Sequence, residues 1–321
     1  MSLSEFDIIA KYFAGHGGRS DVRLGIGDDA AVMDVRADRK LVLAVDTIVE
    51  GVHFLEGADG ADVGYRALAV NLSDLAAMGA EPSWMTLSLS MPTADEQWLA
   101  SFAQGLFHLA GRFDVQLVGG DTVRGPLVVT VQIGGWVEPE QWLTRQGARE
   151  GDAIFVSGIL GEAAAGLDLL REGGSAGEPF DHLRRRFSRP EPRIQLGRAL
   201  RTVASAAMDV SDGLLTDLTK LCSASGCGAR LDLDALPRSE AMQAFLPEDA
   251  RLRYALCGGD DYELLFTAAA SDGEPFDDGK LGGVQIARIG TITSGEGVRC
   301  LRNGKPFTPP WRGYDHFSAS N

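Results

Sequence analysis

Residues 71–80 read NLSDLAAMGA, and the spacing of apolar residues around them predicts a helix over 63–78 that Gly79 ends. Asn71 and Asp74 are three residues apart, so both polar groups share one face of that helix. An apolar helix seldom buries an aspartate unless a cation or several hydrogen-bond donors compensate its charge. We therefore favour a functional role for this face over a structural one.

The segments around this helix alternate between strand and helix patterns. β-branched or apolar runs bounded by glycines predict strands, and a second helical spacing covers 95–110. The strands are expected at 41–45, 85–91, 116–118, 127–131 and, after a polar break near 147–152, 153–157. We predict an α/β (α+β) chain of two domains, each a sheet packed with helices, with residues 1–148 in the first and 149–321 in the second.

Length and charge narrow the class of protein. The 321 residues exceed what one core usually organises, and 45% hydrophobic residues are ample for packed interiors. The formal net charge of −15 argues against nucleic acid or an anionic membrane as a partner. The first residues lack the basic and apolar regions of a secretion signal, and no apolar run approaches the roughly 18 residues of a membrane span. We therefore expect a cytoplasmic protein.

Several local patterns carry structural expectations only. Ser2 and Glu5 predict a capping box that opens a short helix, and 172–181 and 271–283 are expected as surface loops. The four cysteines lack Cys-x-x-Cys spacing, so we expect reduced, mostly buried thiols. The only dense basic run favours a solvated helix face over a phosphate site, and we give no catalytic role to Arg184, Arg185, Arg186, Arg189 and Arg193.

Two acidic motifs lie ahead of the quoted helix. GIGDD at residues 25–29 sets two carboxylates after glycines that let a ligand approach the backbone, although turn chemistry explains the motif equally well. Asp46 follows the apolar run 41–45, so we expect it at the carboxyl end of a strand, where ligands usually bind in α/β sheets. An ordinary turn residue at a strand end is about as probable.

Two more acidic motifs follow the helix. GGDT at 119–122 again places a carboxylate at a predicted strand end, and its alternative is a Gly-rich hairpin. DVSDG at 209–213 follows the apolar run 204–208 and opens a helix through 214–221. An N-cap at Ser211 or Asp212 accounts for one of its three polar residues, and a helix N-terminus also receives phosphate well. Magnesium is the natural cation to collect such carboxylates, with phosphate as its companion.

The usual nucleotide and nucleophile motifs are absent from the sequence. It contains no GxxxxGK[ST], no HRD and DFG set, and no Gly-x-Ser-x-Gly elbow. A nucleotide would therefore be held mainly through metal ions.

Taken in order along the chain, eight motifs resemble the thiamine-monophosphate kinase family. They are GIGDDAAV from residue 25, Asp46-Thr47 with His53-Phe54, NLSDLAAMGAEP from 71, GGDT from 119, LTRQGA from 143, MDVSDGL from 208, GGDDYEL from 258 and WRGYDHF from 311. The resemblance implies the two-domain fold of ATP-dependent enzymes related to aminoimidazole ribonucleotide synthetase. It also implies pairing of first domains into a homodimer.

The resemblance further implies ATP-dependent phosphorylation of thiamine monophosphate to thiamine diphosphate with several Mg²⁺ ions. The implied metal ligands are Asp29, Asp46, Asp74, Asp121, Asp209 and Asp212, with Asp28 as a neighbour. The positions that match nucleotide contacts are Gly120, Asp121, Arg145 and Ser211, and those that match thiamine-phosphate contacts are His53, Asp260 and Trp311. Four of these residues are assigned to catalysis, namely Asp29, Asp74, Asp121 and Arg145. The first domain is expected to bind ATP and magnesium, and the second to complete the nucleotide and substrate site.

Two departures from the family pattern stand out. Relatives often carry Ser or Thr just before the aspartate of the second motif, where this chain has Ala44 and Val45. A hydroxyl ligand there must be lost or replaced. Where relatives often have glutamate, Asp260 is one methylene shorter, which implies a looser or water-bridged substrate contact.

The implied reaction suits the residue types. The acceptor phosphate is already anionic near pH 7, since its second pKa is about 6, and no general base is required. Repulsion is the obstacle, because two unit charges about 4 Å apart cost roughly 4 kcal/mol at an effective dielectric of 20. Magnesium and Arg145 would offset it. The alternatives are another enzyme of the superfamily, such as an aminoimidazole ribonucleotide synthetase, and a non-catalytic metal or nucleotide sensor.

Overall fold

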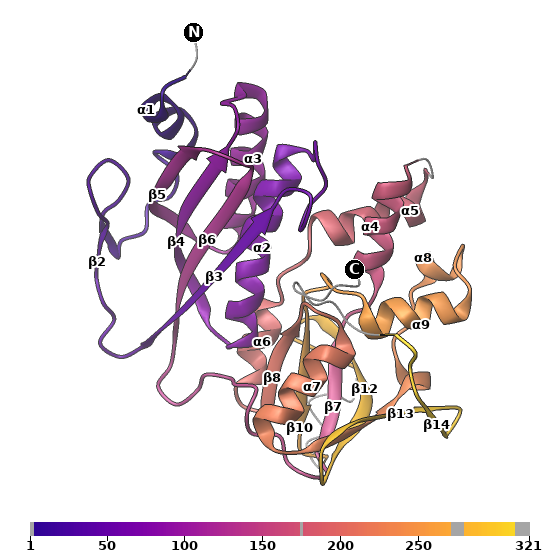
Figure 1. Cartoon of the computed structure of the whole chain (residues 1–321). Helices are drawn as coiled ribbons and strands as arrows, with labels where there is room; N and C mark the ends of the chain where they lie inside the picture. The colour runs from indigo at the N-terminus through magenta and orange to yellow at the C-terminus, as the bar shows by residue number, and fades with distance from the viewer. Residues whose placement is uncertain (1–2, 174–175, 271–278, 312–321) are drawn as a thin grey trace. The chain divides into compact units, whose positions relative to one another are not determined.

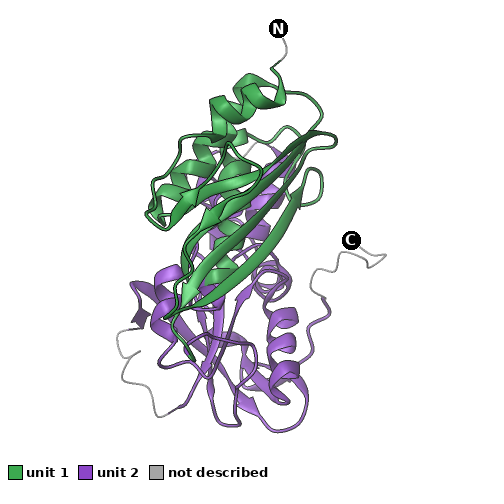
Figure 2. Ribbon diagram, turned by 90° about the vertical axis from the view of Figure 1, so that its left-hand side faces the viewer, with its two compact units in different colours: residues 1–75, 80–140 green, residues 76–79, 141–321 purple. Residues whose placement is uncertain are grey.

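The computed structural model describes residues 3–173, 176–270 and 279–311. The chain divides into two compact units (Figure 2): unit 1 comprises 1–75 and 80–140, and unit 2 comprises 76–79 and 141–321. Each unit has its own sheet with helices packed on it, which confirms the predicted fold class. Among the described helices, none combines the length and the apolar character of a membrane span.

Unit 1 is built on a four-stranded sheet with the order β3-β6-β4-β5 (Figure 1). Neighbouring strands of this sheet are antiparallel, except that β4 and β5 are parallel because helix α3 connects them. The sheet contains β3 (Lys40–Val49), β4 (Glu81–Met91), β5 (Gln116–Arg124) and β6 (Val128–Val137), and its helices are α2 (Gly60–Ala77) and α3 (Glu96–Arg112). All four expected strands and both expected helices are confirmed, and each strand is longer than its apolar run.

The remaining elements of unit 1 are short. A small separate sheet pairs β1 (Val22–Leu24) with β2 (Val32–Met33), and the chain opens with α1 (Glu5–Ile8) and a π-helical turn, η1 (Ile9–Phe13). Ser2 lies outside the described residues. The described capping box instead joins Ser4 and Asp7, two positions after the expected pair, because the Asp7 carboxylate accepts the Ser4 backbone N–H.

Helices α2 and α3 pack so closely that only glycine fits at their crossing. A Cβ atom on Gly64 would lie 2.2 Å from the carbonyl oxygen of Phe102, and one on Gly105 would lie 1.9 Å from that of Ala61. Both distances are far inside van der Waals contact, and in each case the obstacle is backbone. The glycines therefore set the distance between the two helices.

We expect Gly105→Ala to destabilise unit 1 by about 2 kcal/mol or more, because the added methyl group forces two packed backbones apart. Urea unfolding followed by circular dichroism measures the change. Gly111→Ala in the same helix is the matched control, since a Cβ there meets nothing within 4 Å. That control should be neutral or up to ~1 kcal/mol more stable. Equal destabilisation by both variants would contradict this account of the crossing.

Unit 2 contains an eight-stranded sheet with the order β14-β13-β9-β12-β7-β10-β8, and β11 pairs with β12. All neighbours are antiparallel except β13 and β9. The strands are β7 (Ala153–Ser157), β8 (Ala206–Val210), β9 (Gly228–Asp232), β10 (Glu263–Ala268), β11 (Lys280–Leu281), β12 (Val284–Thr293), β13 (Gly297–Arg302) and β14 (Lys305–Phe307). Every residue of β7, β8 and β10 is buried, so both faces of these strands are covered.

The helices of unit 2 complete its core. They are α4 (Glu162–Glu172), α5 (Glu178–Ser188), α6 (Ile194–Leu200), α7 (Leu214–Ser225), α8 (Glu240–Gln243) and α9 (Glu248–Cys257), with a 3₁₀ turn η2 (Leu233–Ala235). An apolar cluster joins α7 to the sheet through side chains such as Leu218 and Leu221. The expectation of a loop over 172–181 is wrong at its end, because α5 begins at Glu178 with Pro179 in its first turn. Of the loop expected at 271–283, residues 271–278 lie outside the described part.

The cysteines are free thiols, as expected. Cys222, Cys227 and Cys300 are buried and Cys257 is half-buried. Burial raises the pKa of Cys222 to about 12 and that of Cys300 to about 11. These thiols are therefore protonated and unreactive at neutral pH.

Candidate active site

Strand β3 and helix α2 bring two of the predicted metal ligands of unit 1 together. Asn71 is fully buried, and its Oδ1 accepts the backbone N–H of Asp46 at 3.0 Å. Asp74 is half-buried one turn further along the same face of α2. The hydrogen bond from the Asp46 backbone to Asn71 thus joins the two elements that carry Asp46 and Asp74. The expectation that Asp46 ends its strand is wrong, because pairing with β6 continues to Val49.

Asp121 also lies inside a strand instead of at its end. Strand β5 continues to Arg124 because its last residues pair with β4. The registers of three strand pairs place Asp121 opposite Ser88, Ser88 opposite Thr130, and Thr130 opposite Thr47. Paired residues project from the same face of a sheet, so a polar row crosses the open face from one edge strand to the other.

The polar row contains hydroxyl groups that sequence reasoning missed. The Oγ1 atoms of Thr47 and Thr130 are 2.8 Å apart, and Ser88 is exposed beside Asp121. Thr47 projects from the same face of β3 as Val45, two residues away. Thr47 therefore offers a hydroxyl near the place where Ala44 and Val45 lack one. Only the strand register reveals this row, which explains why the sequence pattern did not.

Asp28 and Asp29 lie in the exposed loop between β1 and β2. The Asp28 carboxylate accepts the backbone N–H of Asp29 at 2.9 Å, and Gly27 has a φ of +120°. That backbone conformation is open to glycine and strained for other residues. The loop holds its two carboxylates in solvent, where they can reach a cation at little desolvation cost.

Gly120 and His53 have clear local reasons for their identity. A Cβ on Gly120 would lie 1.9 Å from the carbonyl oxygen of Leu87, so neighbouring strand β4 requires glycine there. His53 lies in the turn after β3, where its Nδ1 accepts the backbone N–H of Val49 at 3.1 Å. This hydrogen bond leaves the ring proton of a neutral imidazole on Nε2, which is then a donor.

The donor set fits magnesium better than a softer metal. The predicted ligands of unit 1 are carboxylates, with hydroxyls beside them, and hard oxygen donors suit Mg²⁺. Within the described residues, no three His, Cys, Asp or Glu side chains form a ready metal cluster. Magnesium is commonly bound by one or two carboxylates together with water and substrate phosphates. The pair Asp46 and Asp74 matches that requirement.

In unit 2, the motif 209–213 is organised by a residue that sequence reasoning did not select. Asp217 is fully buried in the first turn of α7, and its Oδ2 accepts the backbone N–H groups of Ser211 and Asp212 at 3.0 and 2.9 Å. The N-cap expected at Ser211 or Asp212 is therefore wrong: Gly213 holds that position and Asp217 supplies the acceptor. Burial raises the pKa of Asp217 against the opposing effect of the Lys220 ammonium.

Asp209 and Asp212, the other acidic residues of this motif, differ in their burial and in their contacts. Asp209 is buried within β8, at 5% exposure. The carboxylate of Asp212 accepts from Lys220 Nζ at 2.5 Å, and Lys220 also contacts Asp217 at 2.8 Å. A cation at Asp212 would have to compete with this ammonium. Asp212 is thus neutralised locally when no metal is bound.

The motif 258–261 lies directly against 209–213. The backbone N–H of Asp260 donates to the carbonyl oxygen of Ser211 at 2.9 Å, and that of Tyr262 donates to Val210 at 2.9 Å. The phenol of Tyr262 also donates to Asp260 Oδ1 at 3.3 Å. Two motifs that are about 50 residues apart in the sequence therefore form one surface of unit 2.

Arg145 and Trp311 are held in different ways. Arg145 is exposed, while its carbonyl oxygen accepts from Ser225 Oγ at 3.0 Å at the end of α7. Trp311 is half-buried against the core of unit 2, with its ring centroid 6.5 Å from that of Phe307. The rest of the WRGYDHF motif lies outside the described residues.

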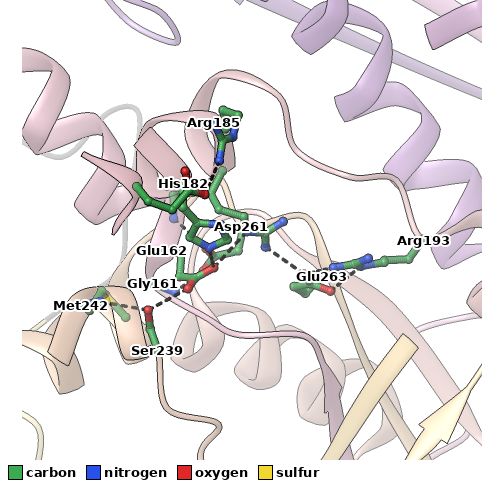
Figure 3. Close-up of polar contacts among 12 residues, drawn as sticks. Gly161, Glu162, His182, Arg185, Arg193, Ser239, Met242, Asp261 and Glu263 are labelled. Carbon is green, nitrogen blue, oxygen red and sulfur yellow. Dashed lines mark hydrogen bonds and ion pairs between the residues drawn. The ribbon is translucent and has the colours of Figure 1, made fainter. Parts of the chain in front are cut away.

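The basic run is a buried ion-pair cluster, so its interpretation as a solvated helix face is wrong for two of its arginines (Figure 3). Glu263 has no exposed surface and accepts from Arg193 at 2.5 and 2.7 Å, from Arg186 at 2.8 Å and from Ser157 at 2.5 Å. Burial alone would raise the pKa of Glu263, but the Arg193 hydrogen bond and the two guanidinium charges lower it. Arg185 and Arg189 are exposed, and Arg185 pairs with Glu178.

A second part of this cluster surrounds Glu162 (Figure 3). Its carboxylate contacts His182 Nε2 at 3.0 Å, Arg186 Nε at 3.2 Å and Ser239 Oγ at 2.7 Å. Asp261 accepts from the backbone N–H groups of Gly161 and Ala163 at the start of α4, at 2.6 and 3.1 Å. Burial raises the pKa of Asp261 to about 7.

Comparison with known proteins gives consistent matches along the chain. The family model for AIR synthase related protein, N-terminal domain, matches residues 27–137, and the model for its C-terminal domain matches 149–301. Thiamine-monophosphate kinase of Escherichia coli K12 is 48% identical over 325 residues, which cover 99% of this chain and 100% of that protein. The same enzyme of Haemophilus influenzae is 41% identical over 327 residues, with 100% of both chains covered.

Two solved structures also match this chain over most of its length. Thiamine-monophosphate kinase from Stenotrophomonas maltophilia K279a matches with a TM-score of 0.82 and 44% identity, over 95% of this chain and 98% of that one. AaThiL complexed with AMPPCP and TMP matches with a TM-score of 0.78 and 33% identity, over 91% and 92%.

Proposed function

This chain belongs to the thiamine-monophosphate kinase family, and from that membership we propose that it transfers the γ-phosphate of ATP to thiamine monophosphate, forming thiamine diphosphate. The main support is the 48% identity, over the full length, to thiamine-monophosphate kinases. The match to AaThiL complexed with AMPPCP and TMP supports the same nucleotide and acceptor for this chain. ATP as co-substrate also favours a cytoplasmic location.

We propose that Mg²⁺ is bound by the carboxylates of Asp29, Asp46, Asp74 and Asp121 in unit 1 and of Asp209 and Asp212 in unit 2. Bound magnesium would neutralise phosphate charge and align the transfer. Three residues of the chain assist. Gly120 lets β5 pack against the backbone of β4 beside Asp121, Arg145 supplies an exposed positive charge, and Lys220 neutralises Asp212 when no metal is bound.

The acceptor contacts proposed are His53, Asp260 and Trp311. The Nε2 proton of His53 can donate to the acceptor phosphate, which needs no general base because it is already anionic near its second pKa of about 6. The Trp311 ring can stack on the cationic thiazolium. One carboxylate oxygen of Asp260 also accepts a hydrogen bond from the Tyr262 phenol, which restrains the position of this carboxylate.

The test of this function is ADP formation measured with each component omitted in turn. We expect turnover only when ATP, magnesium and thiamine monophosphate are all present, and complete loss on adding EDTA. A non-catalytic sensor would bind nucleotide with no such turnover. An aminoimidazole ribonucleotide synthetase would form ADP with its own ribonucleotide substrate and none with thiamine monophosphate.

We expect Trp311→Ala to raise KM for thiamine monophosphate by about 3- to 30-fold, the range of a cation–π contact, and to change KM for ATP less than about twofold. Steady-state kinetics with each substrate varied separately measures both constants. Phe307→Ala is the control, because it removes the neighbouring ring and leaves the indole in place. A similar rise in both variants would make Trp311 a packing residue.

We also propose a homodimer that forms through the open face of unit 1. Edge strand β3 exposes Leu41, Leu43 and Val45, at 48%, 52% and 60%, on one face. Three exposed aliphatic residues in a row on an edge strand are a liability in a monomer and usually mark a contact. A second copy is the occupant that family membership favours.

Leu43→Asp combined with Val45→Asp should convert the dimer to a monomer, because each carboxylate would be buried unpaired in the interface. Light scattering after size exclusion gives the mass directly. Phe6→Asp is the control, since Phe6 is an 80% exposed apolar residue outside the sheet. A wild-type mass of one chain at micromolar concentration would contradict the proposal.

A further inference from the structure

The segment 258–262, which joins α9 to β10, has a backbone that needs outside support. Asp260 has a φ of +71° and Tyr262 a φ of +52°. Non-glycine residues rarely adopt this left-handed conformation, and they keep it only where the surrounding contacts enforce it. Two such residues within three positions mark a strained turn, and Asp260 is the proposed acceptor contact.

Part of the support comes from residues around the turn. The backbone N–H groups of Asp260 and Tyr262 donate to the carbonyl oxygens of Ser211 and Val210. Side chains along the segment alternate: Asp260 and Tyr262 are half-exposed, whereas Asp261 is 1% exposed and binds two N–H groups at the start of α4. Hydrogen bonds therefore hold the turn to the end of β8 on one side and to the start of α4 on the other.

Glu263 supplies the remaining support, directly after the turn. Its two carboxylate oxygens accept four hydrogen bonds, three from the guanidinium groups of Arg186 and Arg193 and one from Ser157. A Cβ on Gly158 would lie 2.2 Å from Glu263 Oε1, so the carboxylate rests on the Gly158 backbone. With no exposed surface and four donors, this side chain has one available position.

We propose that Glu263, held by Arg186 and Arg193, is a positioning residue for the acceptor site. It fixes the first residue of β10 and so keeps the strained turn closed, which presents Asp260 beside Ser211 and Asp212. The inference rests on the proposed function, in which Asp260 contacts the acceptor. Arg186 and Arg193 of the basic run then support the acceptor site through Glu263, without binding substrate themselves.

The cluster is able to rearrange when its charges are altered. Glu263, Arg186 and Arg193 all line a cavity of about 650 Å³. The guanidinium groups therefore have room to move away from a weakened partner, and the turn can relax without unfolding the unit. This makes a conservative substitution informative.

The test compares Glu263→Gln and Arg193→Lys with wild type. Glutamine keeps the size but turns one acceptor into a donor facing guanidinium groups, and lysine keeps the charge but loses the paired hydrogen bonds. We expect KM for thiamine monophosphate to rise about tenfold in Glu263→Gln and less in Arg193→Lys, with KM for ATP changed less than about twofold. A merely structural role would lower the active fraction, and hence kcat, with both KM values unchanged. Arg185→Lys, in the exposed pair with Glu178, should behave as wild type.

Hydrogen exchange of the peptide 257–263 tests the positioning without reference to catalysis. The amides of Asp260 and Tyr262 should exchange about tenfold faster in Glu263→Gln, and faster to a smaller degree in Arg193→Lys, while those of α7 are unchanged. If the wild-type protein shows no kinase activity, the proposed function is wrong, but the hydrogen-exchange test of the positioning role still applies. Unchanged exchange in both folded variants would overturn the positioning role. If Glu263→Gln fails to fold, Arg193→Lys decides alone by the same two readouts.

Discussion

Asp74→Asn should lower kcat by about 10²- to 10³-fold while the protein stays folded. Asp74 is half-buried on α2, one turn after Asn71, which binds the backbone of Asp46, and we propose its carboxylate as a ligand of the magnesium ion. Asparagine keeps the shape and removes the charge that a cation requires. The measurement is kcat at saturating ATP, thiamine monophosphate and magnesium, with circular dichroism to verify the fold.

Asp62→Asn provides the control for this effect. Asp62 lies in the first turn of the same helix, three turns from Asp74, and has no proposed part in metal binding. Its removal should leave kcat within about twofold and cost a few tenths of a kcal/mol through the helix dipole. Turnover that is unchanged in Asp74→Asn at saturating magnesium would exclude Asp74 from the site.

Glu263→Ala should reduce the free energy of unfolding by about 3–5 kcal/mol, the cost of breaking a buried ion pair. The loss is large because Arg186 and Arg193 are left mostly buried without their shared counter-charge. Urea unfolding at pH 7 measures it. Glu178→Ala, which breaks an exposed pair with Arg185, should cost no more than about 1 kcal/mol.

The pH dependence of this difference has a defined sign. The pKa of Glu263 is lowered in the folded protein, so the carboxylate contributes stability above its unfolded pKa of about 4.3. That stability is lost as the pH falls through the lower folded value. The gap between wild type and Glu263→Ala should therefore shrink as the pH falls below about 4. A gap that grows below pH 4 would contradict the assigned ion pairs.

The sequence predicted elements best where burial is complete. Strand β7 has the bounds expected for 153–157 because all five of its residues are buried and form one apolar run. Strands β3 and β5 extend past their expected ends, since each has one face open and carries polar residues there. A polar residue in an open-faced strand looks like a turn in the sequence, which is why Asp46 and Asp121 were expected at strand ends.

Long-range partners were the part that sequence patterns could not supply. The spacing of the basic run gives no sign that Arg186 and Arg193 meet Glu263, which follows them by 77 and 70 residues. Likewise, Ser211 and Asp212 are typical N-cap residues, yet Asp217 takes the acceptor role because its buried carboxylate reaches both backbone N–H groups. The row of Thr47, Thr130, Ser88 and Asp121 exists only through strand register.

The most direct test of the central claim is ³¹P NMR of the purified protein with ATP, magnesium and thiamine monophosphate, with thiamine in a parallel tube. We expect the resonances of thiamine diphosphate and ADP to grow together in the first tube, and no new phosphorylated thiamine in the second. Absence of thiamine diphosphate from the first tube, with ATP bound and unconsumed, would contradict the assignment of this chain as a kinase of thiamine monophosphate.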